Sequence, residues 1–285
     1  MMPSNPRAPR RSTARTILML PKEPVRIEVL PSAALTPAQL DGVWSVTTRY
    51  VDTARPDFER KLGELPEIAL FRTAGGEVVG VTSFDVYRVR RAGRPRTVIF
   101  TSSVVVDERY RRQNLPLRLG VRLFIRTKLR RPLEPVDWLF DTFSYRSYVL
   151  LPRNFAEYWP RRDRATPAGA AAYMDQLARD RYGDAWRPAL GVVGRSGGKR
   201  LRPETAPVDD RLLAADADVR FFDTVNAGHR EGDMLVCLCP LTVQNWAHAL
   251  GSVARRQRDV RARGRSIRRH SASVRRPSLT TNRPA

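Results

Sequence analysis

The sequence predicts an α/β fold, because strand-like and helix-like segments alternate along most of its 285 residues. Short apolar runs that alternate with polar residues, or that are rich in Val, Ile and Phe, predict strands. Longer runs with apolar residues three or four positions apart predict helices. The hydrophobic content of 42% is ordinary for a globular protein, and the length allows one sizeable core with a small second domain or a long extension.

Nine segments predict the order β-α-α-β-β-β-α-β-α over roughly residues 24–155. They cover residues 25–30, 37–51, 57–65, 67–73, 77–89, 97–106, 117–130, 136–143 and 144–152. Two of their boundaries carry strong local signals. Thr36 and Pro37 predict a helix that is capped by Thr36 and has Pro37 as its first residue. Ala74-Gly75-Gly76 predicts the tight turn of a β-hairpin.

Residues 161–256 predict a C-terminal extension whose role the sequence leaves open. Its expected segments are a helix at 167–186, a Gly/Ser-rich linker at 191–202, short strands at 218–223 and 233–239, and a helix at 241–256.

Most of the net charge of +22 belongs to the two ends of the chain. Residues 1–22 carry five basic and no acidic side chains, and residues 255–285 carry eleven arginines and one aspartate. We therefore expect disordered basic tails at 1–22 and 257–285, around a folded domain at 23–160 and the extension. Such tails would contact nucleic acid or other polyanions non-specifically. A GC-rich gene would explain the many arginines equally well.

Several classes of protein and site find no support in the sequence. No apolar run approaches the roughly 20 residues of a membrane helix, so no membrane partner is expected. Two cysteines cannot build a disulfide framework, which favours a cytoplasmic location. Cys237 and Cys239 together with His229 and His248 match no common zinc spacing, so no metal is expected. A sequence-specific DNA-binding protein would need a helix-turn-helix or finger signal, and we find none.

Residues 97–130 carry the clearest functional signal. TVIFTSSVVV predicts a buried strand, DERYRRQNLP a basic turn, and LRLGVRLFIRTKLR a helix. The first amide groups of a helix have no partner within it, and the helix dipole adds partial positive charge there. The strand, turn and helix together predict a phosphate-binding site. The other interpretation is an inert connection with solvated arginines.

Val104–Val106, Asp107, Tyr110, Arg111 and the following helix resemble the coenzyme-A-binding segment of the GNAT superfamily of acyl-CoA N-acyltransferases. The family motif there is R-G-x-G-x-G/A after a strand that ends V-x-P-x-Y, and the resemblance in element order covers residues 24–155. It implies a mixed central sheet flanked by helices. It also implies acyl-CoA as co-substrate and transfer of the acyl group to an amine acceptor that the sequence does not identify.

This chain departs from the family motif at the three small positions, which are Arg112, Asn114 and Pro116. Asn tolerates the left-handed backbone of a tight turn, and Arg112 adds a cation. Pro116 removes one N–H group from the turn. The residues that the resemblance assigns to coenzyme A are Val104, Val106, Arg111, Arg112, Gln113, Asn114, Leu115 and Leu117.

Arg118, Arg122, Arg126 and Arg130 recur every four residues along the same helix. This spacing predicts one stripe of arginines, which we interpret as a solvated face. The alternatives are that these arginines contact the 3′-phosphate of coenzyme A or the backbone of a nucleic acid.

The resemblance also implies an acid and a base. The family often uses a strand carboxylate as base and a tyrosine in the helix after the fifth strand as acid. Asp141 is the predicted base, and Asp85 is a further candidate. Leu151 stands at the family's tyrosine position. Tyr145 and Tyr148 are nearby, one helical turn apart, and Tyr148 is the predicted acid. Each of these side chains also has a purely structural interpretation.

Two functions follow from these residues. The first is an acyltransferase that moves an acyl group from acyl-CoA to an amine. The second is a catalytically inactive GNAT-like binding module whose basic tails contact nucleic acid or another polyanion, because the glycines and the tyrosine of the family motif are missing.

Overall fold

The computed structural model of the chain describes residues 23–194, 198–252, 254–255 and 258. The basic tails expected at 1–22 and 257–285 lie outside the described residues, apart from residue 258. In the described part, no helix is both long and apolar enough to cross a membrane.

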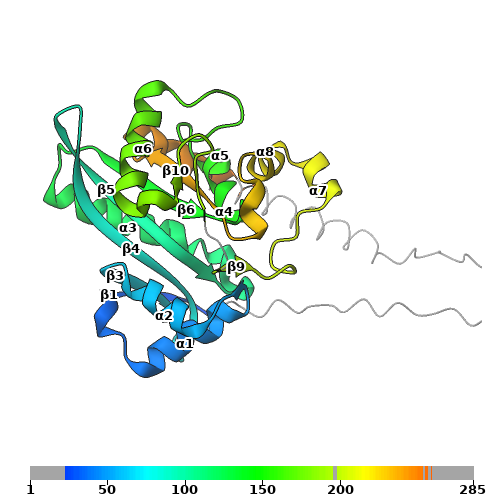
Figure 1. Ribbon diagram of the computed structural model, residues 1–285. Helices are drawn as coiled ribbons and strands as arrows, with labels where there is room; N and C mark the ends of the chain where they lie inside the picture. The colour runs from blue at the N-terminus through cyan, green and yellow to red at the C-terminus, as the bar shows by residue number, and fades with distance from the viewer. Residues whose placement is uncertain (1–22, 195–197, 253, 256–257, 259–285) are drawn as a thin grey trace, which may run out of the picture.

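An eight-stranded sheet forms the centre of the molecule, in the order β1-β3-β4-β5-β6-β10-β8-β7 (Figure 1). Its strands are β1 (Arg26–Pro31), β3 (Glu67–Arg72), β4 (Val78–Arg91), β5 (Arg94–Val106), β6 (Val136–Thr142), β7 (Trp186–Arg187), β8 (Val192–Val193) and β10 (Met234–Pro240). β5 and β6 run parallel, whereas the other neighbours pair antiparallel. The α/β class and the mixed central sheet expected from the sequence are thus confirmed. A separate small ladder joins β2 (Val51–Asp52) to β9 (Arg200–Leu201).

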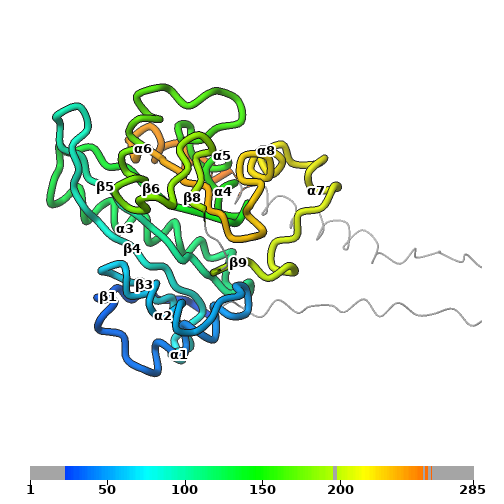
Figure 2. The backbone as a smooth tube through the Cα atoms, viewed as in Figure 1, coloured from blue at the N-terminus to red at the C-terminus, as the bar shows by residue number. Residues whose placement is uncertain are grey.

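Helices cover both faces of the sheet (Figures 1 and 2). They are α1 (Pro37–Thr48), α2 (Arg55–Gly63), α3 (Leu115–Arg130), α4 (Tyr145–Tyr148), α5 (Leu150–Asn154), α6 (Ala168–Tyr182), α7 (Asp210–Ala215), α8 (Ala217–Val225) and the helical residues 243–252. One side of the sheet, the α3 face, packs against α3, α4, α5 and α8. On the other side, the α6 face, α1 and α2 pack over β3 and β4, and α6 packs over β5, β6 and β10.

The start of α1 shows how local sequence sets an element. The Thr36 side chain accepts from the backbone N–H of Gln39, and the Gln39 side chain accepts from the backbone of Thr36. This capping box satisfies two amides of the first turn. The helix start predicted at Pro37 is confirmed.

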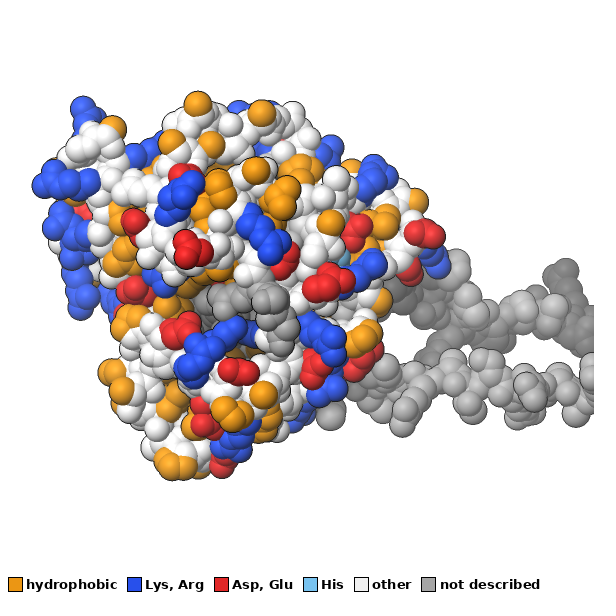
Figure 3. All heavy atoms as spheres, viewed as in Figure 1, with side chains coloured by type: hydrophobic (Ala, Val, Ile, Leu, Met, Phe, Trp, Pro, Cys, Tyr) orange, Lys and Arg blue, Asp and Glu red, His pale blue; other side chains and the backbone are white. Residues whose placement is uncertain are grey.

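β4 and β5 form a long hairpin that extends beyond the helices (Figure 1). Its turn places Ala92 and Gly93 at positive φ angles of 48° and 76°, as a tight hairpin turn with a right-handed twist requires. Exposed arginines Arg88, Arg90 and Arg94 gather near its tip, where Figure 3 shows a basic edge.

Alternation along β6 decides which of its side chains reach the functional face. Trp138 and Phe140 pack in the cluster on the α3 face, whereas Leu139 packs in the cluster under α6. Because successive side chains of a strand point to opposite faces, Asp141 lies on the α6 face.

The strand predicted at 218–223 is wrong, because these residues belong to α8. Val219 and Phe222 are buried three positions apart, at helical spacing. Asp216 caps this helix by accepting from the amides of Asp218 and Val219. A short apolar run fits both the strand and the helix period, and the cap decides between them.

The described residues between 161 and 252 pack in the same core as the residues before them. β10 lies beside β6 inside the sheet, with Leu235 paired with Thr142 and Pro240 paired with Asp137. The helix predicted at 167–186 is α6, which ends at Tyr182, and the strand predicted at 233–239 is β10. The expected boundary at residue 160 therefore does not separate two cores.

Candidate active site

β5 and β6 diverge toward their C-terminal ends. Their parallel pairing ends at Thr101 and Phe140, although β5 continues to Val106 and β6 to Thr142. Beyond the last pair, the facing backbone groups of the two strands are not joined in the ladder. Strand edges of this kind offer N–H and C=O groups to another partner.

A β-bulge in β5 lies at this divergence. Relative to β4, one extra residue of β5 stands between the pairs Val81–Val105 and Ser83–Ser102. Ser103 there has a positive φ of 55°, a left-handed conformation that is uncommon for a residue with a side chain. Bulges bend a strand and redirect its side chains, and Ser103 lines the cavity described next.

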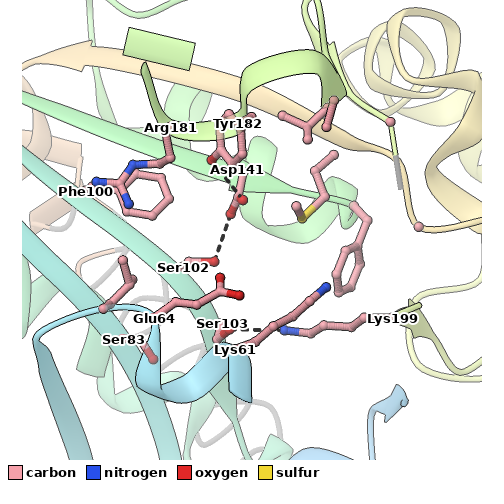
Figure 4. Close-up of a pocket in the computed structure, with 17 residues that line it drawn as sticks. Lys61, Glu64, Ser83, Phe100, Ser102, Ser103, Asp141, Arg181, Tyr182 and Lys199 are labelled. Carbon is pink, nitrogen blue, oxygen red and sulfur yellow. Dashed lines mark hydrogen bonds between the residues drawn. The ribbon is translucent and has the colours of Figure 1, made fainter. Parts of the chain in front are cut away.

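A cavity of about 480 Å³ opens on the α6 face beside the divergence (Figure 4). Its walls come from the end of α2, from strands β4 to β6, from the end of α6 and from Lys199 just before β9. The cavity therefore lies where the helical layer of α1 and α2 meets α6.

Asp141 is held in this cavity by two hydroxyl groups. Ser102 Oγ on β5 donates to its Oδ1 at 3.0 Å, and the Tyr182 hydroxyl at the end of α6 donates to its Oδ2 at 3.0 Å. The Ser102 bond spans the gap between the diverging strands (Figure 4). A carboxylate that is oriented through both oxygens and lines a cavity can accept a proton from a bound amine.

Asp85, the other candidate base, is engaged elsewhere. Its Oδ2 pairs with Arg181 at 3.4 Å. The guanidinium of Arg181 lies 3.8 Å from the centre of the Phe100 ring, and both of these side chains line the cavity. Among the residues that line the cavity, Asp85 is missing, so Asp141 is the stronger candidate.

Ser83 adds a hydroxyl without a partner. Its side chain is 1% exposed and lines the cavity, and its Oγ has no hydrogen bond to the described residues. A buried hydroxyl in this state is available to a ligand or a water.

Tyr148 does not reach the cavity. Its ring is fully buried on the α3 face, where its centroid lies 5.8 Å from the ring centroids of both Phe221 and Phe222. Its hydroxyl donates to the carbonyl of Pro160 at 3.2 Å. Burial raises the pKa of this hydroxyl well above its ordinary value. The prediction that Tyr148 is the acid is corrected, because the sheet separates the Tyr148 side chain from Asp141 and the Tyr148 hydroxyl is already bonded.

The predicted phosphate turn has the expected shape. A 3₁₀ turn over Glu108–Gln113 leads to Asn114, whose left-handed backbone (φ 52°, ψ 38°) starts α3. Pro116 occupies the first turn, where a missing N–H costs no helical bond. The first-turn amides of Leu115 and Leu117 have no acceptor within the helix, so they remain able to bind an anion.

Two of the side chains assigned to coenzyme A are used to hold this turn. Arg111 Nε donates to the Val106 carbonyl at 3.1 Å, and its guanidinium stacks 4.9 Å from the centre of the Tyr50 ring. Gln113 donates from Nε2 to the carbonyl of Glu23 at 2.9 Å. Arg112 is exposed, so it is the side chain of this turn best placed to meet a phosphate.

Val104 and Val106 lie on the diverging part of β5. Val104 is 42% exposed and Val106 is partly buried against the cluster on the α3 face. Their backbone groups belong to the open edge of β5, next to the α3 N-terminus.

Asp107 fixes the entry to the turn. Although burial opposes its charge, hydrogen bonds from the side chain and backbone of Arg109 and the charges of Arg109 and Arg49 lower the pKa of the Asp107 carboxyl. Arg109 also pairs with Glu77 on the neighbouring connection at 2.8 Å.

No local sequence pattern indicates four residues of the site, Ser102, Tyr182, Lys61 and Lys199. Tyr182 fits the buried face of a helix, and nothing local distinguishes it from a core tyrosine. Asp141 and Tyr182 are 41 positions apart, and Ser103 and Lys199 are 96 apart, so only the folded chain brings them together.

Both cysteines and the two described histidines have structural surroundings. Cys237 and Cys239 are buried in β10, and burial raises the pKa of both thiols. His229 bonds to Asp223, and His248 bonds to the carbonyl of Asn154. Within the described residues, no group of three or more His, Cys, Asp or Glu side chains could hold a metal ion.

No protein-family model and no curated protein matches the chain. Solved structures similar to it include a GNAT family N-acetyltransferase, YhbS, from Escherichia coli in complex with CoA (19% identity, 42% of this chain and 63% of that chain, TM-score 0.30). Others are a conserved Enterococcus faecalis protein (14%, 45% and 31%, 0.32) and a Trypanosoma brucei acetyltransferase (20%, 50% and 99%, 0.33). The matched part thus spans less than two thirds of the length of the first two. These superpositions are loose, and the fold rests on the sheet order and strand directions described above.

Proposed function

We propose that this protein is an N-acyltransferase that moves an acyl group from acyl-CoA to an amine. The observation that carries the proposal is the position of Asp141, which stands in a cavity at the point where β5 and β6 diverge. Along the chain, β5 leads from Ser102 and Ser103 in the cavity lining through the turn to the start of α3 at Leu115. A long thioester could extend from the turn at 107–117, along β5, to the cavity.

The turn and β5 would bind the coenzyme A part. Amides of Leu115 and Leu117 and the side chain of Arg112 suit a pyrophosphate. The edge of β5 that faces away from β4, between Ser102 and Val106, suits the amide groups of the pantetheine arm. Tight binding of the phosphates would rely on one fewer amide than in the family motif, because of Pro116.

Asp141 would act as the base. It takes a proton from the ammonium group of the acceptor, and the neutral nitrogen attacks the thioester carbon. The C–S bond breaks, the amide forms, and the departing thiolate takes up one proton while a second proton leaves to solvent. Ser102 and Tyr182 hold the carboxylate of Asp141 in place for this transfer.

Calorimetric titration of the full chain with acetyl-CoA and, in parallel, with ATP tests the proposal. ATP carries a similar negative charge without the pantetheine arm, so it reports non-specific binding to the basic segments. We expect acetyl-CoA to bind at moderate salt at least about tenfold more tightly than ATP, and free thiol to accumulate when an amine is added. Equal binding of the two compounds would contradict the acyl-CoA site. Specific binding without thiol release with any amine would favour the inactive binding module.

A further inference from the structure

The cavity contains positive charge of a kind that is rare in this chain. Of 51 lysine and arginine residues in the sequence, four are lysines: Lys22, Lys61, Lys128 and Lys199. Lys61 and Lys199 both line the cavity. Lysine presents a compact point charge on a flexible stem, whereas arginine presents a planar guanidinium. Almost all other basic residues of the chain are arginines. Two lysines at one cavity therefore point to a function for the ammonium groups.

The two lysines lie on the same side of the cavity, beside Ser103 (Figure 4). Lys199 Nζ is 3.1 Å from Ser103 Oγ. Lys61 Nζ lies 3.8 Å from the position that a Cβ on Gly198 would take, so it lies close to the residue that precedes Lys199. An anion that lay between the two ammonium groups would be attracted to both.

Asp141 supplies the opposite charge from another wall of the cavity. Glu64 and Arg181 also line the cavity, and each pairs with a residue outside the lining, Glu64 with Arg60 at 2.7 Å and Arg181 with Asp85 at 3.4 Å. The Nε of Arg181 has no hydrogen-bond partner among the described residues. The cavity therefore has an acidic position on β6 and a basic position formed by α2 and Lys199. The unpaired hydroxyl of Ser83 lies in the same lining.

We propose that the acceptor is a small amine that also carries an anionic group, such as an amino acid. Its ammonium group would bind at Asp141, and its anionic group would bind at Lys61 and Lys199. This inference rests on the proposed acyltransferase function and narrows its acceptor. Hydrogen bonds between a carboxylate, sulfonate or phosphate and an ammonium group are charge-assisted, which makes them stronger than neutral ones.

Acyl transfer to a matched series of amines tests the inference. β-Alanine, taurine and O-phosphoethanolamine carry a carboxylate, a sulfonate and a phosphate on a two-carbon amine, and n-propylamine carries none. The full chain is assayed with acetyl-CoA by thiol release. Each amine is added so that the concentration of its form with an unprotonated amino group is the same. We expect at least one anionic amine to exceed n-propylamine about tenfold or more in kcat/KM. The preferred member of the series identifies the anionic group.

Variants connect the preference to the lysines. Lys61→Gln and Lys199→Gln should each reduce the preference for the anionic amine severalfold. Lys128→Gln is the matched control, because it removes the same charge from α3 on the opposite face of the sheet, where Lys128 bonds to the carbonyls of Pro132 and Glu134. Melting temperatures of all variants separate a loss of preference from a loss of folding.

The outcomes separate the two proposals. Equal kcat/KM for n-propylamine and every anionic amine, or a preference unchanged in both cavity variants, overturns the inference and leaves the acyltransferase standing. Failure to bind acetyl-CoA overturns the acyltransferase. The inference then depends on direct calorimetry, in which β-alanine must bind the wild-type chain and lose affinity in both cavity variants.

Discussion

Arg122 on α3 donates from Nη1 to the backbone carbonyl of Ile27 on β1, at 3.2 Å. One turn earlier, Arg118 makes the same contact with the carbonyl of Val25. Four helical residues rise about 6 Å and two strand residues about 6.6 Å, so a four-residue repeat of arginines matches alternate carbonyls of an adjacent strand. Arg118, Arg122 and Arg130 are exposed, as expected for a solvated face. The stripe also joins α3 to the edge strand of the sheet, and Arg126 continues it with Glu67 on β3.

Arg126→Glu should destabilise the fold by about 1 kcal/mol or more. Arg126 makes two hydrogen bonds of 2.8 and 2.9 Å to the Glu67 carboxylate, so the change replaces a bidentate pair by two like charges. Urea unfolding measures the effect. Arg130→Glu, at the exposed last turn of the same helix, is the control and should cost less. Equal midpoints for the two variants would contradict a structural function of the stripe.

Arg112→Glu should weaken coenzyme A binding by about 2 kcal/mol, roughly 30-fold in Kd. The exposed side chain stands before the α3 N-terminus, and a carboxylate there would repel the pyrophosphate. Stability should change by no more than about half a kcal/mol. Calorimetry with coenzyme A measures the affinity, and Arg130→Glu serves as the charge-matched control. An unchanged Kd would remove the phosphates from this turn.

Asp141→Asn should lower kcat about 100-fold or more while acetyl-CoA binding stays within a factor of about three. Asparagine keeps the size of the side chain and can still bond to Ser102 and Tyr182, but it cannot take a proton from the acceptor. Steady-state thiol release and calorimetry give the two quantities. A variant with normal kcat would exclude Asp141 as the base.

Tyr148→Phe should leave kcat unchanged and cost about 1 kcal/mol of stability. The Tyr148 hydroxyl is bonded to the partly buried Pro160 carbonyl, so its removal leaves that carbonyl without this donor and touches nothing in the cavity. Thermal unfolding and the same thiol assay check both parts. A large fall in kcat at unchanged acetyl-CoA affinity would restore Tyr148 as a catalytic residue.

Asp107→Asn should reduce stability by about 2 kcal/mol at pH 7, and the reduction should fade in acid. The pKa of Asp107 is lowered in the folded chain, so its charge stabilises the fold fully above its ordinary value near 3.8. This contribution is lost as the pH falls through the lower folded value. Urea unfolding of both proteins between pH 7 and pH 3 measures the difference. A constant difference over this range would exclude the ion pairs with Arg49 and Arg109 as its source.

Local periodicity and turn chemistry predicted eight elements from the sequence alone, namely β1, α1, α2, β3, β4, β5, α3 and β6. The helix predicted at 144–152 is instead two short helices, α4 and α5, and β2 was not predicted. The cap at Thr36, the glycine turn at 74–76 and the strand–turn–helix at 97–130 depend on neighbours within a few residues, so the sequence displays them directly. Asp141 could be predicted as the base because the family resemblance implies a strand carboxylate, and a carboxylate near the end of an apolar strand is visible in the sequence. The period of residues 218–223 was ambiguous, because six residues are too few to separate a strand from a helix.

Only the tertiary structure decided what surrounds Asp141. Sheet order placed β10 beside β6, strand alternation turned Asp141 toward α6, and the packing of α2 and α6 brought Lys61 and Tyr182 to one cavity. The same packing buried Tyr148, which the sequence had offered as the acid. These contacts join residues far apart in the chain and depend on the burial of whole faces, so no local pattern contains them.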